Sequence, residues 1–135
     1  MAGYSETPLL RKLGIKPGYQ LCILNPPEAY WDWLAPLPDD VKVIAKPGKD
    51  GVDFVHLFEQ ERKVFEKDFL AYKKSLRKNG MLWVSWPKKS SKVPTDIDEN
   101  VVRGFGLKNG LVDVKICAVD EVWSGLKFVF RLKDR

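Results

Sequence analysis

Short apolar runs alternate with amphipathic segments along the chain, a pattern typical of a buried parallel sheet covered by helices. The clearest run, GMLWVSWP at 80–87, carries no charge, and a second run, DFVHLF, occupies 53–58. Between them, apolar residues from Phe65 to Leu76 recur at spacings of four, three and four. These spacings place one stripe on a helix. We therefore predict a strand at 52–58, a helix over 59–79 ended by Gly80, and a central strand up to Pro87.

The rest of the chain divides in the same way. We predict helices at 8–13, 28–35 and 96–108, and strands at 19–24, 41–45, 111–119 and 123–132. Thr7-Pro8 is typical of an N-cap followed by the first helical residue, and Asp96 with Glu99 has the capping-box spacing. A tight turn joins the last two strands, which predicts an antiparallel pair. Residues 7–135 are thus expected to form one α/β domain after a flexible tail at 1–6.

Composition narrows the class of protein. A chain of 135 residues that is 44% hydrophobic fits one domain with its own core. No apolar run approaches the roughly 18–20 residues of a membrane span, and the N-terminus lacks a signal-peptide pattern, so we expect a cytoplasmic location. Cys22 and Cys117 each lie in an apolar segment and are expected to be reduced, buried thiols. The net charge of +5 permits an acidic partner, nucleic acid included.

The order of elements resembles the Rossmann-like core of class I S-adenosylmethionine-dependent methyltransferases. The antiparallel ending fits that family's sheet, and Asn79-Gly80-Met81-Leu82 looks like its helix-to-strand glycine turn. The resemblance implies a single Rossmann-like three-layer α/β domain with a mostly parallel six-stranded sheet, order 2-1-3-4-6-5, and the last strand antiparallel. One strand–helix unit of the family is missing after Ala45. The tracts MLWVSWPKK and GLVDVKICAVDEVWSGLKFV are similar to a small bacterial family of uncharacterised domains.

The residues that hold the cofactor in that family do not carry over. The family places a glycine-rich loop after its first strand, where this chain has Asn25-Pro26-Pro27, and two prolines remove two backbone donors. It places an acidic residue after its second strand, where this chain has Ala45-Lys46. We therefore expect no binding of S-adenosylmethionine and assign no cofactor. The tripeptide also resembles the Asn-Pro-Pro-Tyr motif of amino-methylating enzymes, but Glu28 follows it, and we interpret it as coincidence.

No catalytic or metal site is indicated. His56, the only histidine, lies on a buried strand and is expected to be a satisfied core residue rather than a base. Ser85 lacks the flanking glycines of a nucleophile elbow. The cysteines and the histidine do not have metal-ligand spacing.

A candidate ligand crevice follows from the topology. In open α/β sheets, ligands bind beyond the carboxyl ends of the parallel strands at the switch in strand order. Here the switch falls between the first and third strands. The residues predicted to line the crevice are Asn25, Pro26, Glu28, Trp31, Lys46, His56, Phe58, Trp86, Lys88 and Lys89. Its three lysines either attract an anion or acidic partner or belong to an ordinary rim.

Three functions remain open. The leading hypothesis is a non-catalytic binding or interaction module that does not bind S-adenosylmethionine. The first alternative is an enzyme whose altered pocket takes an anionic small molecule. The second is a nucleic-acid-binding protein that uses the basic segments 73–78 and 88–92.

Overall fold

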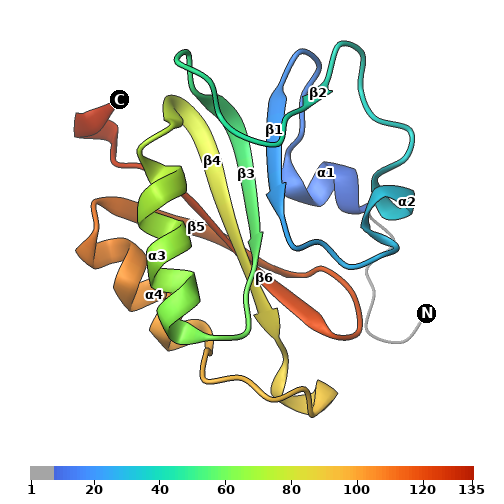
Figure 1. The fold of residues 1–135 in the computed structure, drawn as a ribbon, viewed down its shortest axis with the longest axis vertical. Coiled ribbons are helices and arrows are strands. Elements are labelled where there is room, and N and C mark those ends of the chain that lie inside the picture. Colours follow the sequence, from blue (N-terminus) through green and yellow to red (C-terminus); the bar gives the residue numbers. More distant parts are fainter. Residues whose placement is uncertain (1–7) are drawn as a thin grey trace.

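Six strands lie side by side in one sheet, with helices on both of its faces (Figure 1). The computed structural model describes residues 8–135, so the predicted tail at 1–6 and the predicted N-cap Thr7 lie outside the described residues. The helices are α1 (Leu9–Leu13), α2 (Tyr30–Leu34), α3 (Arg62–Lys73) and α4 (Glu99–Lys108), with short 3-10 helices η1 (Lys89–Ser91) and η2 (Leu132–Asp134). The strands are β1 (Gln20–Leu24), β2 (Lys42–Val43), β3 (Val52–Phe58), β4 (Leu76–Pro87), β5 (Leu111–Ala118) and β6 (Trp123–Phe130).

The sheet has the predicted strand order, β2-β1-β3-β4-β6-β5. The first four strands in this order are parallel, and β6 runs antiparallel to both β4 and β5. The prediction of a Rossmann-like three-layer fold is therefore confirmed. Cys22 on β1 and Cys117 on β5 lie on strands that three others separate, and both are free. Cys22 is buried as expected, whereas Cys117 is only half-buried.

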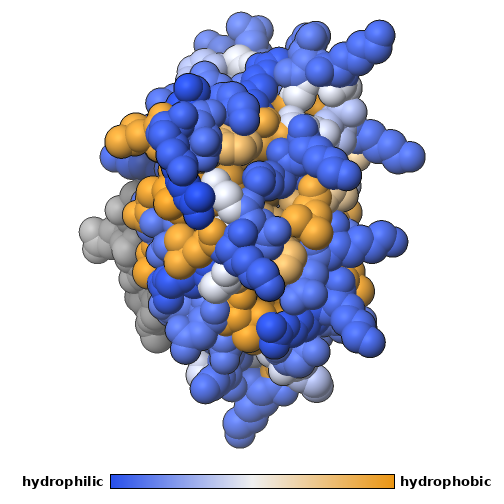
Figure 2. Space-filling model, turned by 90° about the vertical axis from the view of Figure 1, so that its left-hand side faces the viewer, coloured by the Kyte–Doolittle hydropathy of each residue, from blue (hydrophilic) through white to orange (hydrophobic). Residues whose placement is uncertain are grey.

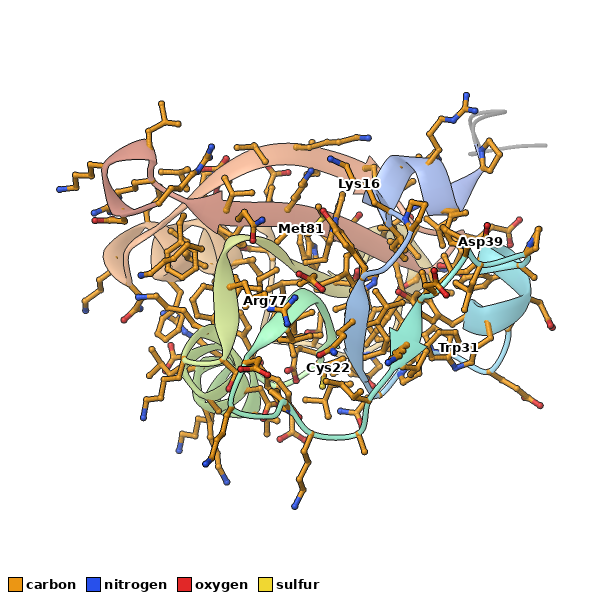
Figure 3. The ribbon with its side chains drawn as sticks, turned by 90° about the horizontal axis from the view of Figure 1, so that it is seen from above. Lys16, Cys22, Trp31, Asp39, Arg77 and Met81 are labelled. Carbon is orange, nitrogen blue, oxygen red and sulfur yellow. The ribbon has the colours of Figure 1, made fainter. Side chains whose placement is uncertain are left out.

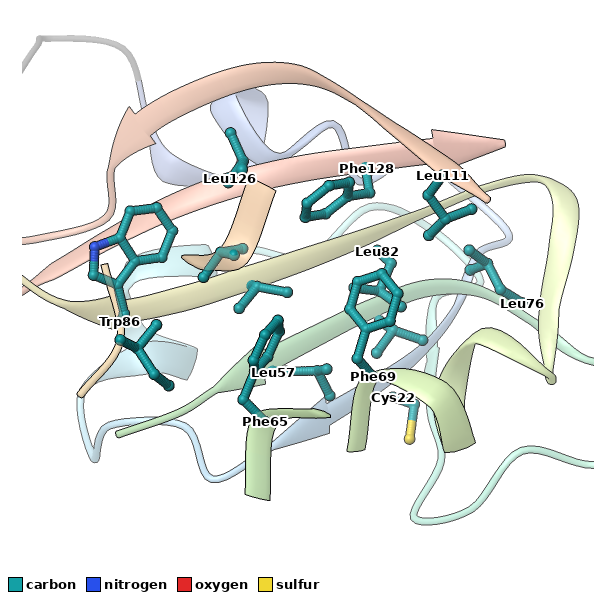
Figure 4. Packing of buried hydrophobic residues seen from close by; sticks show 14 of the residues in the cluster. Cys22, Leu57, Phe65, Phe69, Leu76, Leu82, Trp86, Leu111, Leu126 and Phe128 are labelled. Carbon is teal, nitrogen blue, oxygen red and sulfur yellow. The ribbon is translucent and has the colours of Figure 1, made fainter. Parts of the chain in front are cut away.

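Each face of the sheet has its own hydrophobic core. The face covered by α3 and α4 packs Phe65, Phe69 and Val102 against the central strands (Figure 4). The opposite face, covered by α1 and α2, packs Leu13 and Tyr30. All seven residues of β3 are buried, because this strand has a neighbour on each side and a helix layer on each face. This double burial explains why apolar residues of this strand do not alternate with exposed polar ones.

The boundary between α3 and β4 corrects two predictions. The helix ends at Lys73 rather than at residue 79, and Leu76 already pairs with Val52 on β3. The ladder is then interrupted until Met81 pairs with Phe54, so β4 bulges in between. Gly80 sits inside this bulge, where a Cβ atom would lie 2.7 Å from the carbonyl oxygen of Asp53. The glycine thus permits close approach of two strands, and its assignment as a helix-to-strand turn is wrong.

The residues that cap α4 and α1 also differ from the prediction. Asp98, not Asp96, caps α4, and its Oδ1 accepts a hydrogen bond from the Val101 backbone N–H at 2.9 Å. Asp96 instead accepts from the Arg62 backbone N–H at 2.7 Å, which satisfies a donor at the start of α3. At α1, Pro8 occupies the N-cap position rather than the first turn.

The remaining surface is mixed. On the face that carries α4 and the β5 edge, hydrophobic groups are scattered among hydrophilic side chains (Figure 2). Val114 and Ile116 are the exposed hydrophobic residues of the β5 edge. Within residues 8–135, none of the helices has the length and hydrophobicity that crossing a membrane requires.

Candidate functional site at the carboxyl edge of the sheet

Buried polar side chains concentrate on β3 and at the residue after it. Asp53 lies near the start of this strand, His56 lies in its middle, and Glu59 follows its last residue. A buried polar group costs free energy unless a hydrogen bond compensates it. The partners of these three side chains therefore distinguish structural groups from candidates for binding.

Asp53 is fully partnered. One carboxylate oxygen forms an ion pair with Arg77 Nη1 at 2.9 Å, and the other accepts from the Gln20 backbone N–H at 2.8 Å. Arg77 also donates from Nε to the carbonyl oxygen of Asp50. Figure 3, which looks onto the amino edge of the parallel strands, shows Arg77 lying beside the start of β3. This group holds the bulge of β4 against β3.

His56 is also fully partnered. Its Nδ1 lies 2.8 Å from the Tyr30 hydroxyl, and its Nε2 lies 2.7 Å from Ser85 Oγ. Burial lowers the pKa of His56 to about 3, so the ring is neutral at pH 7. A serine hydrogen-bonded to a histidine resembles an activated nucleophile, but all three side chains have no exposed surface and no substrate reaches them. The prediction of a satisfied core histidine is confirmed, and the chain of hydrogen bonds ties α2 to β3 and β4.

Glu59 is different. Its exposed fraction is 2%, and its Oε2 is the one buried side-chain oxygen or nitrogen without a hydrogen-bond partner among the residues that the structure describes. Its backbone N–H continues the sheet by donating to the carbonyl oxygen of Ser85 at 2.9 Å. Burial, then the hydrogen bond that protonated Glu59 makes with the Asp68 carboxyl, and then the charge of that carboxyl raise the pKa of Glu59 to about 9, while no N–H donor within residues 8–135 reaches its Oε2. The side chain is therefore a neutral acid at pH 7.

Glu59 belongs to a pocket at the carboxyl edge of β1 and β3. The pocket has a volume of about 270 Å³ and is lined by Asn25, Phe58, Glu59, Gln60, Glu61, Val64 and Trp123. We call it the acid-lined pocket. A second pocket of about 410 Å³ shares Gln60 and Glu61 with it and adds Pro94, Thr95 and Asp96.

The wall between the two pockets is fixed by hydrogen bonds. Thr95 Oγ1 donates to the carbonyl oxygen of Gln60 at 2.6 Å, and Gln60 Nε2 donates to that of Pro94 at 3.2 Å. Together with the Asp96 contact to the start of α3, these bonds hold residues 94–96 beside the end of β3. The local geometry is thus built before any ligand arrives.

The predicted crevice residues fall into separate places. Asn25 and Phe58 line the acid-lined pocket. Trp86, Lys88 and Lys89 line another pocket, of about 280 Å³, at the start of α4. His56 is buried, Pro26 is half-buried, and Glu28, Trp31 and Lys46 are exposed. Lys88 donates to the carbonyl oxygen of Asp120 at 2.7 Å. The three lysines therefore do not converge on the acid-lined pocket.

The sequence analysis missed Glu59 because it assigned this residue to the first turn of the long helix, where acidic residues are common. The structure begins α3 at Arg62 and places Glu59 directly after a fully buried strand. A useful signal was present, since the carboxyl end of a central parallel strand is where α/β sheets bind ligands.

The positions where the resemblance implies cofactor-binding residues hold other groups in this chain. Asn25 has a φ of 56°, so it makes the turn after β1 that a glycine would otherwise make. Pro26 and Pro27 follow and lack backbone N–H groups. Ala45, after β2, has no side-chain carboxylate, and its carbonyl oxygen accepts a weak bond from the Cys22 thiol. No group of three or more metal-binding side chains is found within residues 8–135.

Neither the protein-family models nor the curated protein sequences give a match to this chain. These comparisons lend no support to the sequence likeness with a bacterial domain family.

Comparison with solved structures gives a clear result. A S-adenosylmethionine-dependent methyltransferase from Aquifex aeolicus is similar at a TM-score of 0.64 and 13% identity, over 91% of this chain and 88% of that one. One from Thiobacillus denitrificans, in complex with S-adenosyl-L-homocysteine, has a TM-score of 0.61 and 11% identity, over 96% and 93%. A putative type 11 methyltransferase from Sulfolobus solfataricus has a TM-score of 0.56 and 14% identity, over 82% and 84%. At these identities the likeness shows the fold, which is that of the S-adenosylmethionine-dependent methyltransferases.

Proposed function

We propose that the chain is a small cytoplasmic, non-catalytic binding module on a methyltransferase-like fold. It binds its ligand in the acid-lined pocket and does not bind S-adenosylmethionine. The observation that carries this proposal is the turn after β1, where Asn25 adopts the left-handed conformation and two prolines follow it. A cofactor at this turn depends on close backbone approach and on free N–H donors, and the prolines supply neither.

Two further features support the proposal. The residues after β2 are Ala45 and Lys46, so no carboxylate stands where the ribose hydroxyls would need one. The acid-lined pocket, at about 270 Å³, lies below the roughly 300–1,000 Å³ of ordinary ligand pockets. Its size suits a small group better than a nucleoside-bearing cofactor.

The enzyme alternative has little to support it. The serine and histidine that approach each other are enclosed in the core. That alternative also needs lysines to bind an anion, and the three predicted lysines lie outside the acid-lined pocket.

The nucleic-acid alternative is weakened by geometry. Residues 73–78 lie at the start of β4 and residues 88–92 lie beyond its end. A strand of this length separates them by roughly 30 Å, so the two segments do not form one surface. Three of the basic side chains are also engaged: Lys73 with the Asn109 carbonyl oxygen, Arg77 with Asp53, and Lys78 over the Phe130 ring.

The test is a thermal unfolding series with S-adenosylmethionine and S-adenosylhomocysteine up to millimolar concentration. A ligand at 100 times its Kd stabilises the native state by about 2.7 kcal/mol, which raises the Tm of a domain of this size by several degrees. We expect no rise in Tm with either compound. A methyltransferase of the same fold, assayed in parallel, serves as the positive control. A rise of several degrees would contradict the proposal.

A further inference from the structure

We propose that the acid-lined pocket binds an alkylammonium group, that is, a protonated primary amine on an apolar stem. The inference rests on the proposed function, because it assigns a ligand class to the same pocket. It is carried by the charge of the lining, by the orphaned carboxyl oxygen of Glu59 and by the apolar side chains beside it.

The charge of the lining is opposite to that of the whole chain. The protein carries a net charge of +5. The acid-lined pocket and the pocket beside it are nevertheless lined by Glu61 and Asp96, by Glu59 as a neutral acid, and by no lysine, arginine or histidine. A concave surface lined by one sign of charge raises the local concentration of ligands of the opposite sign. The lining therefore favours a cation.

Glu59 also provides an acceptor for a hydrogen-bond donor on the ligand. A buried carboxyl oxygen that accepts no hydrogen bond carries a desolvation cost. Within the described part of the chain, Glu59 Oε2 accepts none, the residue has an exposed fraction of 2%, and its side chain has only the Asp68 carboxyl as a partner. An ammonium group offers three N–H donors and a compensating charge. A ligand with this head group would satisfy the orphaned oxygen.

The apolar members of the lining suit the stem of such a ligand. Phe58, Val64 and Trp123 share the pocket with the carboxyl groups. The rings of Phe58 and Trp123 meet edge to face, with centroids 5.1 Å apart. Aromatic rings attract ammonium groups and pack well against methylene chains. A volume of about 270 Å³ holds a short alkyl chain with its head group.

Binding should be coupled to the release of one proton. In the empty protein Glu59 holds a proton below its raised pKa of about 9. The ligand arrives as R–NH₃⁺, Glu59 loses its proton to water, and the product is the ion pair of carboxylate and ammonium. Affinity should therefore rise between pH 7 and pH 9, since an alkylammonium stays protonated to a pKa near about 10.4.

The other titratable groups around Glu59 do not reverse the expected rise of affinity with pH. Asp68 and Tyr72 approach from α3, Cys22 lies next to Tyr72 on β1, and Glu61 lines the same pocket. Burial raises the pKa of Tyr72 and of Cys22 above their ordinary values. Both stay neutral over most of the range in which Glu59 loses its proton.

The probe is n-butylammonium chloride, titrated into ¹⁵N-labelled protein at constant ionic strength. We expect saturable shifts of the Asn25 side-chain amide and the Trp123 indole N–H. The neutral n-butanol and the anionic butyrate have the same stem and should produce no saturable shift. Equal shifts with n-butanol or butyrate would overturn the proposal. A second arm uses an acetylated, amidated Gly-Lys-Gly peptide: tighter binding than n-butylammonium identifies a protein-borne lysine as the source, and weaker binding identifies a free amine.

Variants assign the effect to Glu59. Glu59→Gln keeps the shape of the side chain and should weaken n-butylammonium binding at least tenfold at pH 9. Asp39→Asn removes one exposed charge at the amino edge, where the Asp39 carbonyl oxygen accepts from Gly18, and should leave the affinity unchanged. Binding by Glu59→Gln within twofold of the parent would refute the inference. Because S-adenosylhomocysteine is tested separately, failure of this inference is distinguishable from failure of the proposed function.

Discussion

A buried carboxyl group lies at each end of β3, and the two groups differ in their hydrogen-bond partners. Asp53, at the amino end, is a buried carboxylate with an arginine and a backbone N–H as partners. Glu59, at the carboxyl end, is a buried carboxyl with one oxygen unpartnered and a raised pKa. Between them His56 has a partner on each ring nitrogen.

This difference separates the structural end of the strand from the end where we propose that a ligand binds. Partnered polar groups stabilise a fold and hold its strands in register. An unpartnered buried group is rare in native structures and calls for a specific explanation. In this fold the orphan lies at the carboxyl edge, next to the switch in strand order, where α/β sheets bind ligands.

The largest loss of stability is expected at the amino end. Asp53→Ala leaves Arg77 and the Gln20 backbone N–H without their acceptor, and we expect a loss of about 3 kcal/mol in the free energy of unfolding. Urea denaturation at pH 7 measures it. Asp50→Ala is the matched control, because Arg77 uses only the backbone carbonyl of Asp50, and it should change stability by less than about 0.5 kcal/mol. Equal stability of Asp53→Ala and the parent would show that the amino end is not a structural anchor.

A smaller effect is expected in the middle of the strand. Tyr30→Phe removes one hydroxyl and leaves His56 Nδ1 buried without a partner. The expected loss is about 2 kcal/mol, measured by the same denaturation. The pKa of His56 in the parent lies below its ordinary value of 6.5, so the stability that the neutral ring contributes is present above pH 6.5 and is lost as pH falls toward about 3. A variant as stable as the parent at pH 7 would mean that the hydrogen-bonded chain contributes nothing to the core.

An effect of opposite sign, which depends on pH, is expected at the carboxyl end. The pKa of Glu59 in the folded protein lies above its ordinary value of 4.5, so the stability linked to its proton is present below pH 4.5 and is lost as pH rises toward about 9. Glu59→Gln does not titrate. Its free energy of unfolding should therefore gain on that of the parent by roughly 1.4 kcal/mol per pH unit, about 4 kcal/mol in all between pH 5 and pH 8, and a gap that stays constant would contradict the raised pKa.

The sequence predicted the topology well for physical reasons. The apolar runs are long enough to identify β3 and β4, and the tight turn before Trp123 makes β5 and β6 antiparallel, whereas the strand order was implied by the resemblance to the methyltransferase core. The end of α3 was not predictable in the same way. None of the six residues after Lys73 is glycine or proline, and the helix stops because the Ser75 carbonyl oxygen accepts from the Val52 backbone N–H and Leu76 then joins β3. Such tertiary contacts override local propensity.

A pocket lies at the edge where the topology predicted a crevice, its lining differs from the predicted one, and ligand binding there stays a prediction. Topology placed the crevice at the carboxyl edge between β1 and β3, and Asn25 and Phe58 do meet there. The lysines were assigned to the same crevice because the sequence does not reveal that the chain after β4 turns toward α4. Glu59 was not predicted as a site residue, because its burial depends on the packing of Asp68 and α3, which no local sequence pattern encodes.

The central claim is that Glu59 is a buried acid that binds a cation, and the titration of the Glu59 carboxyl tests this claim most directly. The measurement is the ¹³C shift of the Glu59 side-chain carboxyl carbon against pH, with and without saturating n-butylammonium. The account predicts a midpoint near 9 in the free protein and a clear fall of that midpoint in the presence of the amine. A midpoint near the ordinary value of 4.5 that the amine leaves unchanged would contradict it.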